Sequence, residues 1–315
     1  MMPSAAKDYK MNKEELRKFV LDNPKLVTMR PAGDGIYVLK YKRTVFYDNL
    51  WNEYLEECRG TIVDADFNVV SRPFTKIYNY GIEAKAPVLA DDTPVTAYRK
   101  VNGFMVAMTW YRNDVLVSTT GSTDSDFVGY AREMMQKHMP WADWQMELKT
   151  AEGMTLMFEA CHKNDPHIIP ESAGMYFLGC RENAWDSEVK MYGKDMAEWA
   201  RDYALSHLKC GYAEAVHTTM GELVQMSKTV KHEGFVFYTT DNVSAKIKSP
   251  YYLTSKWVAR NPRTDKLVDL NKDIKHNLDE EYYPLVDAIR ANIVEYTAMD
   301  EQTRLAWVRN FVGQE

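Results

Sequence analysis

The alternation of apolar and polar residues along the chain predicts a mixture of antiparallel strands and helices. Three hairpins are expected where two apolar or β-branched runs flank a short polar turn. Their strands are expected at 61–64 with 69–72, 104–111 with 115–120, and 233–238 with 243–248. Further strands are expected at 154–160, at 175–180, and once or twice within the aromatic-rich stretch 36–47.

Helices are expected where apolar residues recur every three or four positions. One should begin at Lys13, with Asn12 as its N-cap and Glu15 bonding back in a capping box. The others are expected at 126–138, 195–207, 219–227, 282–296 and 300–312. The fold class predicted is therefore α+β, with antiparallel sheets. Residues 1–264 should form one large domain and residues 265–315 a small helical C-terminal domain.

Composition and charge narrow the class of protein. Hydrophobic residues make up 45% and charged residues 27%, the balance of a folded globular chain. No apolar run approaches the roughly 20 residues of a membrane helix. No secretory signal is evident either, so we expect a cytoplasmic protein without a membrane partner. The four cysteines lack C-x-x-C spacing, which argues against a zinc site. A net charge of −6 argues against coating nucleic acid by bulk charge, but a local basic groove stays compatible with it.

Lys100 opens the segment Lys100-Val101-Asn102-Gly103, which predicts a nucleophilic lysine on a tight turn. Such a lysine must lose the proton that it carries at neutral pH before it can attack phosphorus. Lys246 and Lys248 are two residues apart in an expected strand, so both project from one face. We expect them to favour the neutral amine of Lys100 and to hold an α-phosphate.

Four more residues have the chemistry of a nucleotide site. Glu159 and Glu233 adjoin strongly β-forming residues, where carboxylates bond ribose hydroxyls or hold Mg²⁺ or Mn²⁺ through water. Arg59 and Lys76 suit the β- and γ-phosphates, because guanidinium and ammonium groups pair with phosphate oxygens. Each feature alone is common on protein surfaces, so their combined order along the chain carries the prediction.

These segments, in this order, resemble the motifs of the covalent nucleotidyltransferases, the superfamily of ligases and capping enzymes. Within it, residues 55–250 resemble the bacteriophage T4 RNA ligase 1 family. The matching segments are Cys58 to Gly60, Ser71 to Asn79, Lys100 to Gly103, Phe158-Glu159, Leu178 to Asn183, Glu233 to Val236 and Lys246 to Lys248. Asn102 departs from the family, because the motif usually has aspartate there; the change removes one negative charge beside Lys100.

The resemblance implies an ATP-dependent RNA ligase that forms a lysyl-AMP on Lys100, adenylylates an RNA 5′-phosphate and seals it to a 3′-hydroxyl. It implies ATP and a divalent cation as cofactors, and Tyr176 or Phe177 stacking on adenine. These two residues alternate faces, so at most one can serve. The implied partner is single-stranded RNA or tRNA under repair, with single-stranded DNA left open. A monomer is expected, in the host cytoplasm if a phage encodes it.

Two alternatives stay open. A DNA ligase or an mRNA-capping guanylyltransferase would carry an oligonucleotide-binding barrel after the last motif, whereas the residues after Lys248 have helical periodicity. A non-catalytic nucleic-acid-binding relative would have little need for all of the polar residues named above. The sequence therefore favours an active RNA ligase.

Overall fold

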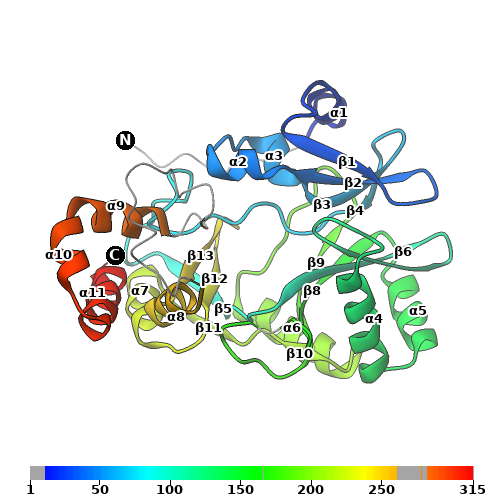
Figure 1. The fold of residues 1–315 in the computed structure, drawn as a ribbon. Coiled ribbons are helices and arrows are strands. Elements are labelled where there is room, and N and C mark those ends of the chain that lie inside the picture. The colour runs from blue at the N-terminus through cyan, green and yellow to red at the C-terminus, as the bar shows by residue number, and fades with distance from the viewer. Residues whose placement is uncertain (1–10, 166, 261–277, 279–281, 315) are drawn as a thin grey trace.

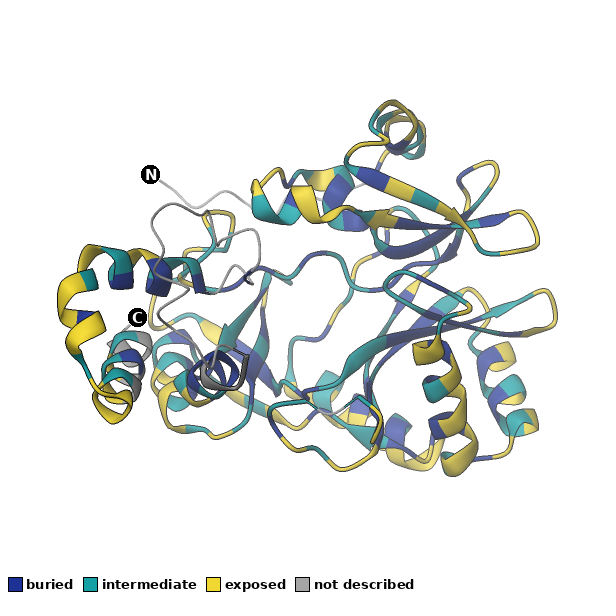
Figure 2. Cartoon of the chain, viewed as in Figure 1, coloured by how far each residue is buried: buried dark blue, intermediate teal, exposed yellow. Residues whose placement is uncertain are grey.

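Three sheets form the framework of the computed structural model, which describes residues 11–165, 167–260, 278 and 282–314. The strand orders are β1-β2-β3-β4, β10-β9-β8-β6-β7 and β11-β5-β12-β13, and all pairs are antiparallel except β10 with β9. Helices cover the outer faces of these sheets (Figure 1). The central strands are mostly buried and the outward helix faces are exposed, and a separate buried cluster lies against each sheet (Figure 2).

The first sheet and three helices make the N-terminal layer. Its elements are α1 (Lys13–Asp22), β1 (Val27–Pro31), β2 (Ile36–Tyr41), α2 (Arg43–Tyr47), α3 (Glu53–Glu57), β3 (Arg59–Asp64) and β4 (Val69–Ser71). Asn12 caps α1 as predicted, but Glu15 accepts from the Tyr54 hydroxyl and forms no capping box. The strand expected over 36–47 is wrong after Tyr41, because a helical turn there buries Val45 alone.

The central sheet matches the predicted hairpin and strands. Its strands are β6 (Phe104–Tyr111), β7 (Asp114–Thr119), β8 (Met154–Cys161), β9 (Gly174–Glu182) and β10 (Gly211–Tyr212). One face is covered by α4 (Asp126–His138), α5 (Trp141–Thr150) and α6 (Lys194–Ser206). The sequence predicted α4 and α6 but not α5, which buries only Trp144 and Leu148 and so has a weak apolar period.

The third sheet carries the predicted C-terminal hairpin. Its strands are β5 (Pro94–Arg99), β11 (Ala215–Thr219), β12 (Gly234–Thr239) and β13 (Ser244–Lys248), with α7 (Met220–Thr229) packed on them. β5 and β11 were not predicted. β5 is buried on both faces at 95–98, so it lacks the alternation of a strand with one wet face.

The described residues after β13 form four helices: α8 (Pro250–Arg260), α9 (Tyr283–Ala291), α10 (Ile293–Ala298) and α11 (Glu301–Gln314). The helix expected over 282–296 is divided at Asn292. Trp257 of α8 packs with Leu285 and Ile289, so α8 shares the core of the last helices. The predicted domain boundary at 264/265 lies outside the described residues. No helix within the described ranges combines the length and the apolar character needed to cross a membrane.

Candidate active site

Lys100 lies on the segment that joins two sheets, between the end of β5 and the start of β6. Its backbone N–H donates to the carbonyl of Gly234 at 2.8 Å, which fixes the segment against β12. In the β12–β13 register, Gly234 is opposite Lys248 and Val236 is opposite Lys246. The third sheet thus brings together Lys100, Glu233 and the two lysines that the sequence separates by more than a hundred residues.

The ammonium of Lys100 is 3.0 Å from one oxygen of Glu233, and Nζ of Lys248 is 3.9 Å from the other. Burial lowers the pKa of Lys100, but the charges of Glu233 and Glu159 outweigh burial and Lys248, so the pKa is raised. Lys248 acts on this pKa in the expected direction and favours the neutral amine, but the two glutamates outweigh it. The Glu233 carboxylate, which forms an ion pair with the ammonium, keeps the proton on Lys100.

The two glutamates respond differently to the same surroundings. Burial raises the pKa of Glu233, but Lys100, Lys248 and the Asn102 amide outweigh it and hold the pKa below its ordinary value. Burial also raises the pKa of Glu159, and here Lys100 only partly offsets the effect. Glu233 therefore keeps its charge more readily, and Glu159 is the more easily protonated of the two.

Asn102 and Gly103 position these carboxylates. The Asn102 amide donates to Glu233 at 2.6 Å, and the Gly103 N–H donates to Glu159 at 3.0 Å. A Cβ atom at position 103 would overlap the carbonyl oxygen of Ala160, so only glycine lets β6 approach β8 this closely. The departure from aspartate at position 102 thus gives Glu233 a hydrogen-bond donor in place of a second carboxylate.

The segment 72–80 forms backbone hydrogen bonds with Lys246 of β13. The Tyr78 carbonyl accepts from the Lys246 N–H at 2.9 Å, and the Lys246 carbonyl accepts from the Tyr80 N–H at 2.8 Å. Lys76 nevertheless does not line the cavity beside Lys100. Its ammonium is 2.6 Å from Glu83 and 4.8 Å from the Trp51 ring centroid, buried in the N-terminal layer. Its phosphate contact stays a prediction that this position does not support.

A cavity of about 160 Å³ opens beside Lys100. Its polar lining includes Arg59, Glu159 and Lys246, and its apolar lining includes Phe74, Tyr98, Met105, Leu178 and Val236. The sequence analysis did not single out these apolar residues, although Phe74, Leu178 and Val236 lie within the matching segments. The available signal was the alternation of side chains along strands. Counted from Glu159 and Lys246, it indicates which residues of these and the neighbouring strands face the same side. The mixed lining suits a flat heterocycle joined to phosphates.

The two candidates for stacking on adenine, Tyr176 and Phe177, lie in different surroundings. Phe177 is 1% exposed and packs against Phe158 and Tyr203 under the helices, so its candidacy is wrong. Tyr176 faces the other way, opposite Glu159 in the β8–β9 register, and its hydroxyl donates to the Ser172 carbonyl. It lies outside the lining of the Lys100 cavity, and its stacking stays a prediction.

Comparison with known families now decides the identity of the fold. The RNA ligase family of the T4 RNA ligase 1 type matches residues 57–252, which is more than half of the chain. The chain belongs to this RNA ligase family. The matched range holds Lys100 and the other site residues, from Arg59 to Lys248, so the family match and the geometry describe the same site.

Solved structures share the fold of this RNA ligase. An archaeal ATP-dependent RNA ligase (form 2) has a TM-score of 0.59 at 14% identity, covering 97% of this chain and 77% of its own. A putative ATP-dependent DNA ligase from Aquifex aeolicus has a TM-score of 0.58 at 13% identity, covering 95% and 78%. The fold is thus common to RNA and DNA ligases. No curated protein matches the sequence.

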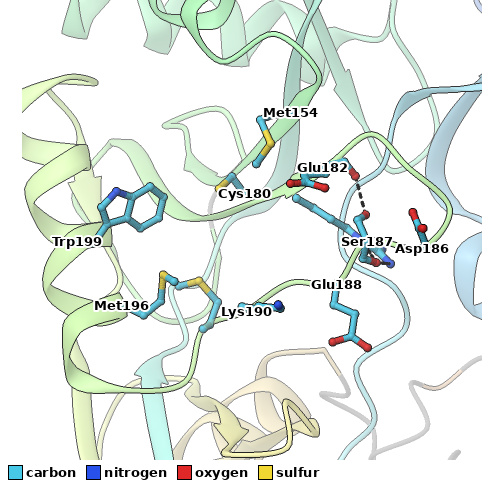
Figure 3. Close-up of a pocket in the computed structure, with 11 residues that line it drawn as sticks. Met154, Cys180, Glu182, Asp186, Ser187, Glu188, Lys190, Met196 and Trp199 are labelled. Atoms are coloured by element: carbon cyan, nitrogen blue, oxygen red, sulfur yellow. Dashed lines mark hydrogen bonds between the residues drawn. The ribbon is translucent and has the colours of Figure 1, made fainter. Parts of the chain in front are cut away.

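A larger cavity, of about 690 Å³, lies elsewhere among the described residues. Figure 3 shows its apolar end at Trp199, Met196 and Met154, and its acidic end at Glu182, Asp186 and Glu188. None of Lys100, Glu159, Glu233 and Lys248 lines it. Size therefore does not identify the active site; the convergence of the polar groups around Lys100 does.

The residues around Lys100 suit a divalent cation that keeps most of its waters. Within the described ranges, no three acidic, histidine or cysteine side chains converge as a metal-binding group. Glu159 and Glu233 offer carboxylate oxygens, and Oδ1 of Asn102 is buried without a hydrogen-bond partner among the described residues. These hard oxygen donors fit hydrated Mg²⁺ better than a fully protein-ligated ion.

Proposed function

We propose that this RNA ligase uses ATP to join RNA 5′-phosphate and 3′-hydroxyl ends through a covalent lysyl-AMP on Lys100. The observation that carries the proposal is the placement of Lys100 between Glu233 and the cavity that Arg59 and Lys246 line. A nucleophile, carboxylates and phosphate-binding cations meet at one cavity there. The archaeal structures of this fold are ATP-dependent RNA ligases, which supports ATP as the nucleotide.

The chemistry divides into two transfers of the adenylyl group and a final attack on the RNA 5′-phosphorus. First, the neutral amine of Lys100 attacks the α-phosphorus of ATP, a phosphorus–nitrogen bond forms, and pyrophosphate leaves. An oxygen of the RNA 5′-phosphate then displaces the lysine and takes the AMP. Finally the RNA 3′-hydroxyl attacks the activated 5′-phosphorus, loses its proton, and releases AMP. Lys248 and Lys246 stabilise the charge that builds up on the α-phosphate during the first transfer.

Glu159, Glu233 and Asn102 are the residues that would hold Mg²⁺ or Mn²⁺, through water. When bound, the cation supplies charge neutralisation at the phosphates. The protein's own task is to release Lys100 from its ion pair with Glu233, since the ammonium has no lone pair with which to attack.

Labelled ATP tests the proposal. Incubation of the protein with α-labelled ATP and Mg²⁺ should leave the label on the denatured chain, and Lys100→Ala should abolish it while the melting temperature shows an intact fold. Retained labelling in that variant would refute the assignment of Lys100. Sealing of a 5′-phosphorylated RNA to an RNA 3′-hydroxyl, with ATP and not with GTP, separates a ligase from a capping enzyme.

The finer features of the substrate belong to the proposal as well. We expect single-stranded RNA or tRNA under repair as the working substrate, with single-stranded DNA a weaker one, and a monomeric enzyme in the cytoplasm. After Lys248 the described residues form helices α8 to α11, where DNA ligases and capping enzymes carry a barrel. The alternative of a DNA ligase or a capping enzyme is therefore disfavoured. A nicked DNA duplex that seals as fast as single-stranded RNA would reverse this order.

A further inference from the structure

A row of aromatic side chains begins directly after the Lys100 segment. The Phe104 ring meets Phe127 edge-to-face at 5.0 Å, Phe127 meets Tyr130 at 5.9 Å, and Tyr130 stacks on His162 at 4.3 Å. We call these four residues the aromatic rim. Phe127 is 41% exposed, so the rim is open to solvent at its centre. An exposed aromatic ring that already has aromatic neighbours presents a flat, pre-ordered face to a ligand.

Lys40, Arg43 and Arg59 form a group of cations on the neighbouring N-terminal layer. Lys40 and Arg59 are opposite one another in the β2–β3 register, and Arg43 begins α2 just beyond β2. We call these three residues the cationic cluster. Burial, followed by the charges of Arg59 and Arg43, lowers the pKa of Lys40. Among the salt bridges of the described residues, none involves a member of this cluster.

One loop joins the cluster to the rim. A Cβ atom on Gly121 would come within 2.6 Å of Nζ of Lys40, and one on Gly60 within 2.9 Å of Cα of Thr120. The loop 120–125 therefore lies against β3 and Lys40, and it leads directly into α4, which carries Phe127 and Tyr130. Arg59 also lines the Lys100 cavity, so cations, loop and aromatic rings border the proposed active site.

Cations without carboxylate partners, next to exposed aromatic rings, match the two needs of a single strand of nucleic acid. Its phosphates pair with lysine and arginine, and its unpaired bases stack on aromatic faces. A duplex offers the phosphates but keeps its bases stacked within the helix. The contrast with the acidic net charge of −6 marks the cationic cluster as a local feature.

We propose that the cationic cluster and the aromatic rim form a docking surface for single-stranded RNA, with backbone phosphates at Lys40 and Arg43 and an unpaired base on Phe127. The proposal rests on the RNA ligase function proposed above and names the residues that select its strand. It explains how an acidic protein brings an RNA end to Lys100.

Binding of a fluorescent single-stranded RNA, measured by anisotropy with the full chain, tests the base contact. Phe127→Leu keeps the apolar packing against Phe104 but removes the aromatic face, and should weaken binding about tenfold. Phe127→Tyr should bind within about twofold of the wild type. An RNA duplex should bind both variants as it binds the wild type. Unchanged single-strand binding by Phe127→Leu, or an equal loss with the duplex, would overturn the stacking role.

The salt dependence of the same binding tests the phosphate contacts. The double variant Lys40→Gln/Arg43→Gln should reduce the slope of log affinity against log salt concentration by about 1.4, since each single-strand phosphate contact contributes about 0.7. The control Lys149→Gln/Lys228→Gln changes the net charge equally at two exposed positions on α5 and α7. Equal slopes in the two double variants would overturn the phosphate contacts.

Trp199→Leu is the matched control for the rim, because Trp199 is also 41% exposed but lines the large cavity of Figure 3. It should leave RNA affinity unchanged, and a loss equal to that of Phe127→Leu would overturn the proposal. Adenylylation of Lys100 by labelled ATP needs no RNA. Its absence in the wild type would therefore refute the proposed function and not the docking surface, whereas its presence without RNA binding would refute the surface alone.

Discussion

Nζ of Lys100 lies 3.0 Å from Oε2 of Glu233, so the candidate nucleophile and its carboxylate form an ion pair across 133 positions of the sequence. The side chain of Glu233 is 5% exposed, and Asn102 and Lys248 complete its surroundings. This pairing therefore holds the candidate nucleophile in its protonated, unreactive form. Attack on ATP requires that this proton leave.

The pH dependence of lysine adenylylation follows from this pairing. The raised pKa of Lys100 means that the reactive neutral fraction grows about tenfold per pH unit below that pKa. We expect the single-turnover rate with labelled ATP to rise with pH between about 6 and 9. Glu233→Gln removes the charge that holds the proton, so its profile should shift toward lower pH even though its maximal rate falls. A flat profile in the wild type would contradict the stored ammonium.

Lys248→Ala should reduce lysyl-AMP formation by about a hundredfold or more, because the α-phosphate loses a fixed charge that acts in the transition state. The Lys248 side chain is 8% exposed and its ammonium also lies 5.3 Å from the Tyr252 ring centroid, so it is well positioned. Labelled adenylate on the denatured protein measures the effect. Lys149→Ala on exposed α5 is the control. A normal adenylate yield would refute the role given to Lys248.

Asn102→Ala should slow adenylylation about tenfold, because Glu233 loses a buried hydrogen bond to its charged form. The same loss removes a contribution that lowers the pKa of Glu233, so the pKa should move upward. The optimum of the rate against Mg²⁺ concentration provides a second readout, since Oδ1 of Asn102 is one of the proposed oxygen donors. An unchanged rate at all Mg²⁺ concentrations would show that Asn102 is only a turn residue.

Lys76→Met should destabilise the fold by about 3 kcal/mol, because the buried Glu83 carboxylate loses the cation 2.6 Å away. Urea unfolding measures the change. Lys194→Met, which breaks an exposed pair with Glu198, should leave the unfolding midpoint near that of the wild type. If Lys76→Met unfolds like the wild type yet loses adenylylation, the sequence-based assignment to the ATP phosphates holds and the structural role fails.

Several elements could be predicted from the sequence because their signals are local. The hairpin of β12 and β13 has a polar turn between two β-branched runs, and α4 has a full apolar stripe that buries Val128 and Met135. The strand prediction failed after Tyr41, because the aromatic residues there face partly outward on a single helical turn. The strand β5 escaped notice because burial on both faces removes the alternation on which strand prediction depends.

The sequence by itself determined the chemical inventory of the site: the order of Arg59, Lys100, Glu159, Glu233 and Lys248, and the family to which that order belongs. Only the tertiary structure decided which of these groups touch and in what charge state. Strand register, which no local pattern encodes, sets Lys100 against Glu233 and turns Phe177 into the core. Burial and charge proximity are properties of that packing, and they determine the protonation of Lys100.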